Sequence, residues 1–250
     1  MTAQNHVKTD AGNFTIIVPV FEETDALAFS NFYFTTYNLQ PIYALDSKRI
    51  QRRAEVEKLL GHEVMIYDNP GNCIEASYDR LAALSPTDWI LRVDCDEVPN
   101  VEMLAHCARF VSHPKDAYCG YDRDDLIWRG ERFEQLKYAP LFVDTQFRLF
   151  NRAKVQFVSR IHTPGFHVPK WKVPFVPIWN APRSARLYHL QRLFITQAQR
   201  AEKLARYNGE GQDQKFNDWL ARPNDTFTWC PFRDENFAQV FIRWKATQRP

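Results

Sequence analysis

The sequence predicts one α/β domain over residues 1–250, with a mostly parallel central sheet flanked by helices. In the first half, short apolar runs rich in β-branched residues alternate with segments of helical periodicity. The fourth apolar run ends in a group of acids, as expected where parallel strands present their carboxyl ends to a ligand. With 45% hydrophobic and 25% charged residues, the chain is apolar enough to bury one sizeable core.

The first half contains four apolar runs that are typical of strands buried on both faces. They lie at residues 14–21, 42–46, 63–67 and 88–94. Apolar residues at helical spacing predict helices between them: one over residues 25–37 capped by Thr24, one begun by Ser47 and ended by Gly61, and one carrying Ile74 to Ala82. A strong turn signal, DNPG at residues 68–71, follows the third strand. This alternation favours parallel pairing with helices on both faces.

The second half is aromatic and strand-like after a helix at residues 101–111. Its predicted elements are a hairpin around Gly130, strands at residues 147–150, 155–158 and 185–188, a proline-rich loop at residues 164–182, and a helix at residues 195–207. The cluster at residues 122–125 (DRDD) is interpreted as a solvated turn. A polar tail with scattered aromatic residues is expected to follow the last helix.

Charge and composition exclude several classes of protein. Lys and Arg number 32 against 30 Asp and Glu, so the net charge of +2 lacks the basic excess of a nucleic-acid binder. No apolar run reaches the roughly 18 residues of a transmembrane helix, and the first dozen residues lack the apolar stretch of a secretory signal. Five widely spaced cysteines without a C-x-x-C pair predict reduced thiols. We expect a cytoplasmic protein.

Three acids follow the fourth strand directly: Asp94, Asp96 and Glu97. Carboxylates two residues apart repel each other unless a cation lies between them. Oxygen ligands with room for phosphate and water suit Mg²⁺ or Mn²⁺, and such an ion neutralises the charge on a departing diphosphate. The alternative is a solvated acidic loop. The acids flanking Cys95 raise its expected pKa, which disfavours a thiolate nucleophile.

The stretch DWILRVDCDE at residues 88–97 resembles the D-x-D strand of GT-A-fold glycosyltransferases. The similarity is greatest to family-2-like bacterial enzymes that build surface polysaccharide and lipopolysaccharide. IIVPVFEE at residues 16–23 is similar to their first strand, LDS at residues 45–47 to their second, and RLFNR at residues 148–152 to a later hairpin. The resemblance implies a nucleotide-sugar-binding half over about residues 14–115 and a smaller mixed β/α acceptor-side half over about residues 116–250.

The implied activity is metal-dependent transfer of a sugar from a nucleotide-diphosphate donor, with a UDP-sugar favoured, to a hydroxyl of a glycan or lipid-linked acceptor. A single displacement would invert the anomeric centre. By resemblance, Asp96 is the metal ligand, Asp94 contacts the ribose or shares the ion, and Asp46 accepts from the base unless it caps the following helix instead. The remaining residues implied at the nucleotide-sugar site are Pro19, Val20, Phe21, Glu22, Asn69, Gly71 and Arg92.

The third metal ligand and the general base are less closely defined. His162 and His189 both follow strand-like segments that return to the sheet, and an imidazole can complete a Mn²⁺ site. Similar enzymes have His-Glu where this chain has His162-Thr163, so that acid is absent. An inverting transfer needs a carboxylate near the acceptor hydroxyl, for which Asp144 and then Glu97 are the candidates. Further candidates for the base are Asp122, Asp124 and Asp125, and the tryptophans available to stack on a sugar are Trp128, Trp171 and Trp179.

Two other classes of function remain as alternatives. A nucleotidyltransferase also uses paired acids on a nucleotide-binding sheet, but the Gly-rich basic loop expected after its first strand is FEETD here, at residues 21–25. A non-catalytic carbohydrate- or nucleotide-binding module would use the same crevice without turnover. The stretch VPKWKVPF at residues 168–175 would suit peripheral contact with the inner face of a membrane, or a loop on the acceptor side.

Overall fold

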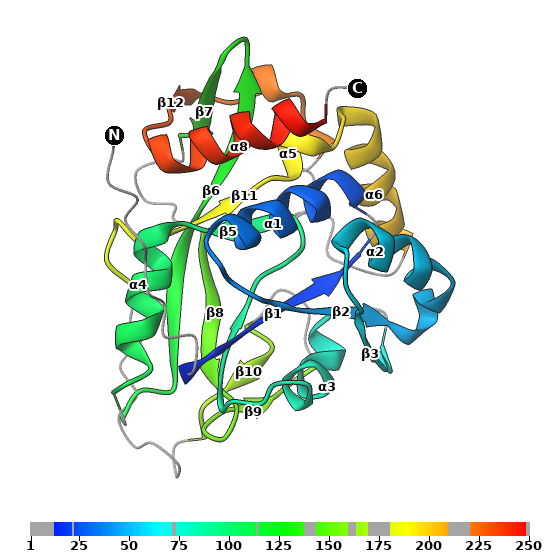
Figure 1. Cartoon of the computed structure of the whole chain (residues 1–250), viewed down its shortest axis with the longest axis vertical. Helices are drawn as coiled ribbons and strands as arrows, with labels where there is room; N and C mark the ends of the chain where they lie inside the picture. The colour runs from blue at the N-terminus through cyan, green and yellow to red at the C-terminus, as the bar shows by residue number, and fades with distance from the viewer. Residues whose placement is uncertain are drawn as a thin grey trace.

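A computed structural model describes residues 13–21, 23–71, 74–113, 115–137, 144–159, 164–169, 181–209 and 221–248 of the chain. Its ten-stranded sheet has the order β12-β7-β6-β8-β4-β1-β2-β3, and β11 joins it by pairing with β6 and with β5. Strands β9 and β10 form a separate two-stranded sheet. Figure 1 shows helices α1 and α8 crossing in front of the upper part of the sheet, with α4 along its left side.

The first four strands are parallel, as the sequence predicts. They are β1 (Thr15–Val20), β2 (Ile42–Asp46), β3 (Met65–Tyr67) and β4 (Trp89–Arg92). Strand β1 pairs with both β2 and β4, and β2 pairs with β3, so all four carboxyl ends lie at one edge. The predicted α/β fold with a parallel sheet flanked by helices is therefore confirmed.

Antiparallel strands from the second half extend this sheet. Strand β8 is antiparallel to both β4 and β6, which makes β6 run in the same direction as β4. The hairpin of β6 and β7 turns at Gly130, whose φ of 65° suits glycine in a tight turn. The bounds are β5 (Glu97–Pro99), β6 (Tyr118–Arg129), β7 (Arg132–Leu136), β8 (Thr145–Asn151), β9 (Gln156–Phe157), β10 (Phe166–His167), β11 (Arg186–His189) and β12 (Trp229–Pro231).

Helices pack on both faces of the sheet and create two hydrophobic cores. Helices α1, α2, α4 and α8 enclose the larger one, while α3 with β9 and β10 covers the smaller one. Alternate residues of β1 serve the two cores, because Ile16 and Val18 point into the first and Ile17 into the second. The helices are α1 (Thr24–Thr36), α2 (Arg53–Leu60), α3 (Tyr78–Ala83), α4 (Val101–Phe110), α5 (Gln191–Phe194), α6 (Gln197–Gly209) and α8 (Glu235–Thr247), with 3₁₀ turns η2 (Ser47–Arg52), η3 (Ile74–Ser77) and η4 (Asn224–Thr226).

Three local expectations were wrong. Thr24 is the first residue of α1 and not its N-cap, because the N-cap position is occupied by Glu23. Asp46, not Ser47, caps the turn after β2 by accepting from the backbone N–H of Lys48, while the Ser47 hydroxyl donates to Asp68. Strand β9 pairs with β10 and not with β8 across the preceding turn. Gly61 ends α2 with a φ of 77°, as the sequence predicts.

The expected polar tail is instead the amphipathic helix α8. Asp234 caps it by accepting from the backbone N–H of Phe237. Its buried residues are Phe237, Val240, Phe241 and Trp244, which follow the spacing of one helix face. Phe29 of α1 packs edge-on against three of these aromatic rings. The C-terminal segment thereby completes the larger core.

Replacing Phe237 by alanine is expected to lower the free energy of unfolding by about 3–5 kcal/mol, because it removes a fully buried ring from the centre of this cluster. Chemical denaturation of the full chain measures the change. Ile242→Ala is the matched control, since Ile242 lies on the exposed face of the same helix and its loss should change stability by less than about 0.5 kcal/mol. Equal losses in the two variants would contradict the packing of α8.

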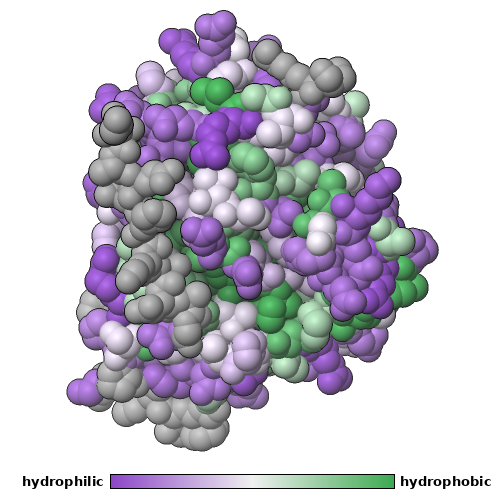
Figure 2. All heavy atoms as spheres, viewed as in Figure 1, coloured by the Kyte–Doolittle hydropathy of each residue, from purple (hydrophilic) through white to green (hydrophobic). Residues whose placement is uncertain are grey.

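Hydrophilic side chains cover most of the face seen in Figure 2, and hydrophobic ones gather toward its centre and its right-hand edge. The large hydrophobic side chains that are exposed among the described residues are Ile50, Met65 and Ile242. Within the described part of the chain, every helix is too short or too polar to cross a membrane.

Candidate active site

The acidic residues form a tight connection from β4 to β5 at the carboxyl edge of the parallel strands. The Glu97 backbone N–H donates to the Asp94 carbonyl at 2.9 Å, and the Asp94 backbone N–H donates to the Glu97 side chain at 3.2 Å. The Asp96 carbonyl accepts from the backbone N–H of Leu190 at 2.7 Å, just after β11. The loop is therefore fixed to the second half of the chain by its own backbone.

Strand register brings His189 to these acids. In the parallel pair of β11 and β6, His189 lies opposite Asp125, and in the antiparallel pair of β11 and β5 it lies opposite Glu97. Residues directly opposite one another share a face of a sheet, so three titratable side chains from three strands meet on the same side. The cluster at residues 122–125 is part of β6 and not a solvated turn, and Asp125 is fully buried.

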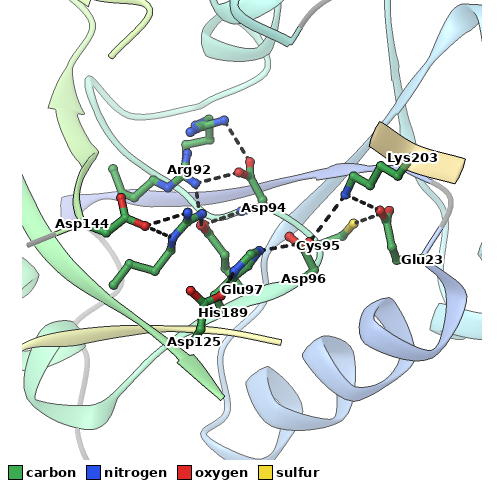
Figure 3. A network of polar contacts seen from close by, with 12 residues as sticks. Glu23, Arg92, Asp94, Cys95, Asp96, Glu97, Asp125, Asp144, His189 and Lys203 are labelled. Atoms are coloured by element: carbon green, nitrogen blue, oxygen red, sulfur yellow. Dashed lines mark hydrogen bonds and ion pairs between the residues drawn. The ribbon is translucent and has the colours of Figure 1, made fainter. Parts of the chain in front are cut away.

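Two arginines neutralise Asp94 (Figure 3). One carboxylate oxygen of Asp94 accepts from Arg92 at 2.8 Å and the other from Arg148 at 2.6 Å. Arg92 also lies over the Tyr78 ring, 4.6 Å from its centroid. Because both oxygens of Asp94 already bind guanidinium groups, this geometry favours the ribose-contacting role for Asp94 over direct metal ligation.

Glu97 lies beneath Asp94 with a side chain that is 0% exposed. It accepts from Arg148 at 2.6 Å and from Arg123 at 3.2 Å. Burial and the negative charge of Asp94 raise the pKa of Glu97 to about 8, against the opposing effect of Arg123. Full burial and the bonds to two arginines disfavour Glu97 as general base, a role that stays a prediction from the sequence. Its contacts give it the role of holding two arginines in place.

Asp144, the other candidate base, lies nearer the surface. Arg123 donates to Asp144 through its side chain at 2.7 Å, and Gln146 donates to the second carboxylate oxygen at 2.6 Å. The Arg123 backbone N–H also donates to the Asp144 carbonyl at 2.8 Å. Asp144 is therefore fixed relative to β6, with its side chain partly exposed. That is the arrangement expected of a positioned base.

Asp96, His189 and Asp125 form a line of contacts across the site. His189 contacts Asp125 through Nδ1 at 2.5 Å and faces Asp96 through Nε2 at 3.4 Å. Burial and Arg123 disfavour the protonated ring, but Asp125 and Asp96 outweigh them and raise the pKa of His189 to about 9. Burial would raise the pKa of Asp96, but His189 and Lys203 hold it well below its usual range.

Lys203 of α6 reaches the same site from the second half of the chain. Its ammonium lies 2.7 Å from Glu23 and 4.0 Å from Asp96 (Figure 3). The Cys95 thiol lies 3.8 Å from the other Glu23 oxygen and is buried. Burial, Glu23 and Asp96 raise the pKa of this thiol well above its usual value, which confirms the expectation that Cys95 is a poor nucleophile.

The donor set at Asp96 fits a divalent cation that is completed by substrate. Within the described residues, no three His, Cys, Asp or Glu side chains converge as a ready-made metal site. Asp96 Oδ2 and His189 Nε2 are 3.4 Å apart, which two ligands of one ion with bonds of about 2.1 Å can span once the cation displaces the Nε2 proton of His189. Asp125 supplies the carboxylate that typically orients a ligating histidine through its other nitrogen. Such ions take their remaining ligands from phosphate and water.

Hydrogen bonds between side chains and backbone connect the loops that follow β1, β2 and β3. Asn69 is buried and accepts from the Gly71 backbone N–H at 3.1 Å. The Gly71 carbonyl accepts from Lys48 at 2.8 Å, and Arg52 donates to the Phe21 carbonyl at 2.7 Å. These bonds hold the three loops together at the edge where Asp94 lies.

The predicted site residues are only partly brought together. Asp94, Asp96, Glu97, Arg92, Asp144 and His189 belong to one network, and Asp46, Asn69, Gly71 and Phe21 lie at the neighbouring strand ends. Pro19 and Val20 are buried within β1, and Val20 packs in the larger core; their contact with a nucleotide stays a prediction. Glu22 and His162 lie outside the described residues. The sequence analysis missed Arg123, Lys203 and Glu23, and it gave no structural role to Asp125.

Asp125→Asn is expected to weaken Mn²⁺ binding in the presence of UDP by about 10- to 100-fold, because the orienting charge behind His189 is lost. Electron paramagnetic resonance of free and bound Mn²⁺ measures this without any turnover. Asp122→Asn is the matched control on the same strand, since Asp122 binds Arg186 and Thr145 instead. A normal Mn²⁺ affinity in Asp125→Asn would show that His189 is not a ligand.

Fold and site together define an α/β protein whose acids gather at the carboxyl edge of the parallel strands of its central sheet. No protein-family model and no curated protein matches the chain. Three solved structures that are similar to it are of TarS from S. aureus. TarS 1–349 is 12% identical with a TM-score of 0.37, over 83% of this chain and 69% of that chain.

TarS 1–349 in complex with UDP-GlcNAc is 15% identical with a TM-score of 0.40, over 83% of this chain and 70% of that chain. A further TarS structure is 13% identical with a TM-score of 0.38, over 83% of this chain and 42% of that chain. Scores below 0.5 mark a distant likeness of the fold, from which we infer no function.

Proposed function

We propose that this chain is a metal-dependent glycosyltransferase that moves a sugar from a nucleotide-diphosphate donor, preferably a UDP-sugar, to a hydroxyl acceptor with inversion. The observation that carries the proposal is the line of Asp96, His189 and Asp125 at the carboxyl edge of parallel strands. That edge is where open α/β sheets bind nucleotides. The basic groups around it suit a substrate with several negative charges.

The donor would lie along the ends of β1 to β4. In this proposal Asp46, which caps the turn after β2 with Oδ1, accepts from the base with its other carboxylate oxygen. Asn69 and Gly71 border the nucleoside, and Asp94 accepts from the ribose. Asp96 and His189 would hold Mn²⁺ or Mg²⁺, which when bound supplies positive charge to the leaving diphosphate. Arg148, whose Nε has no hydrogen-bond partner among the described atoms, is the protein group best placed to add charge there.

The acceptor hydroxyl would approach from the side of Asp144. Asp144 would accept the hydroxyl proton as the new bond to the anomeric carbon forms and the bond to the diphosphate breaks. Arg123 holds Asp144 by a side-chain and a backbone bond, so it acts as a positioning residue. One displacement with the base opposite the leaving group inverts the anomeric centre.

The acceptor is proposed to be a glycan or a lipid-linked sugar. The basic aromatic stretch at residues 168–175, expected to contact a membrane surface or the acceptor, lies mostly outside the described residues, as do Trp171 and Trp179. Location at the inner face of a membrane therefore remains a prediction from the sequence.

A panel of nucleotide-sugars with and without Mn²⁺ tests the proposal. We expect one donor to raise the melting temperature only when Mn²⁺ is present, and the same donor to be hydrolysed slowly to its nucleoside diphosphate. Binding without any release of nucleoside diphosphate would favour the non-catalytic module. With added pyrophosphate, formation of a nucleoside triphosphate and a sugar 1-phosphate would instead favour a nucleotidyltransferase. Equal stabilisation with and without metal would contradict the metal dependence.

A further inference from the structure

A cavity of about 610 Å³, bounded by described residues, lies between the end of β6, helix α5, the start of α6 and η4. We call it the arginine cavity, after Arg129, Arg192 and Arg200 in its wall; Trp128, Phe194 and Asn224 also line it. Sites for small molecules typically have volumes of about 300–1,000 Å³. The cavity shares no lining residue with the donor edge of β1 to β4.

Positive charge is concentrated in this wall. Arg192 and Arg200 are only 5% and 2% exposed, and both donate to the same Asn224 oxygen, at 2.9 and 3.4 Å. Two guanidinium groups that meet at one oxygen repel each other, and burial strengthens the repulsion. Arg129 adds a third positive charge, while Asp225 is the acid in the same wall. An anionic ligand would offset this repulsion.

The cavity is connected to the candidate active site through helix α6. Arg200 precedes Lys203 by one helical turn on α6, and Lys203 contacts Glu23 and approaches Asp96. Helix α5 begins two residues after His189 (yellow in Figure 1, next to the gold α6).

From this geometry we infer that the arginine cavity binds a phosphate group of the acceptor, so that the acceptor is a phosphorylated sugar or glycan. The inference deepens the proposed transferase function and rests on it, because only a transferase has an acceptor to which the bound phosphate can belong. Guanidinium groups bind phosphate oxygens in pairs with good geometry. Trp128 offers a partly buried ring for the apolar face of a sugar, as its place in the sequence suggested.

Calorimetric titration of the full chain with glucose 6-phosphate, and with glucose as the uncharged control, tests the inference. We expect glucose 6-phosphate to bind and glucose not to bind, with an affinity that falls as salt is added. Arg129→Gln should weaken glucose 6-phosphate binding by about fivefold or more, because one phosphate contact is lost. Arg129 is 53% exposed, so its replacement leaves the fold intact.

Arg132→Gln is the matched control. Arg132 lies on the same hairpin, pairs with the same Glu134 and is 72% exposed, but it is absent from the cavity wall. Equal affinities in the two variants, or no binding of glucose 6-phosphate at millimolar concentration, would overturn the inference. Binding only to vesicles that contain phosphatidic acid would also overturn it, since the phosphate would then belong to a lipid headgroup.

Titration of the same sample with UDP and Mn²⁺ separates this inference from the proposed function. If UDP fails to bind while glucose 6-phosphate binds in an Arg129-dependent way, the phosphosugar cavity stands and the donor site is wrong. If UDP binds and glucose 6-phosphate does not, the donor site stands and the cavity assignment is overturned.

Discussion

Asp96→Asn is expected to abolish the Mn²⁺-dependent stabilisation by a nucleotide-sugar and to lower its turnover by about 100-fold or more. Asp96 presents the carboxylate oxygen that faces His189 Nε2, and asparagine replaces it with an uncharged group of the same shape. The charge that would hold the cation disappears, while the backbone bond from the Asp96 carbonyl to Leu190 remains. Thermal shift measures the stabilisation, and release of nucleoside diphosphate measures the turnover.

The matched control for this variant is Asp88→Asn, at the opposite end of β4. Asp88 is 62% exposed and pairs with Arg152, so both stabilisation and turnover should stay near those of the unmodified chain. If Asp96→Asn keeps metal-dependent donor binding, the metal does not bind at this edge of the sheet. The proposed ligand pair of Asp96 and His189 would then be wrong.

Arg148→Met is expected to lower the free energy of unfolding by about 3–5 kcal/mol, the largest change of stability in the site. Arg148 binds Asp94 and Glu97 with one nitrogen, at 2.6 Å to each, and lies in the interior of the sheet. Methionine fills similar space but leaves both carboxylates without this buried positive charge. Urea denaturation at neutral pH measures the loss. Arg53→Met, which breaks an exposed pair with Glu57, should change stability by less than about 1 kcal/mol.

The loss in Arg148→Met should shrink as the pH is lowered. Burial already raises the pKa of Glu97 to about 8, and removing a guanidinium raises it further. An acid whose pKa is higher in the folded state binds more protons there, so its contribution to stability falls as pH rises through that range. Denaturation at pH 5 should therefore give a smaller difference from the unmodified chain than at pH 8. If the difference in stability between Arg148→Met and the unmodified chain is the same at pH 5 and at pH 8, the protonation of Glu97 does not contribute to it.

The sheet edge could be predicted from sequence because its signals are local. Short apolar runs such as residues 14–21 and 88–94 are typical of buried strands. The acids that follow Arg92 come directly at the end of the second of these strands. Helix ends were less predictable, because Asp46 and Ser47 are both residues that commonly cap helices. Only the fold shows that the Ser47 hydroxyl bonds to Asp68 and that Asp46 is the cap.

The missing part of the site depends on contacts between distant segments. Arg148 meets Glu97 across 51 positions of sequence, and Lys203 meets Glu23 across 180, so no spacing rule connects them. Asp125 had a usable signal, since apolar residues follow its cluster at residues 126–128, as in a strand. Charge density led to a turn being expected there. In the folded chain, Arg186 neutralises Asp122 and Asp124, and His189 neutralises Asp125, which allows the strand to be buried.

The register of the four-residue strand β11 limits the insertions and deletions that this protein can accept during evolution. His189 meets both Asp125 and Glu97 only in one register, and neighbouring side chains on a strand point to opposite faces. Deleting a single residue between Arg186 and His189 would turn the imidazole away and bring Leu190 to its position. Length variation among descendants of this sequence should therefore accumulate before Ala185 and stop abruptly at the strand, whatever acceptor each descendant uses.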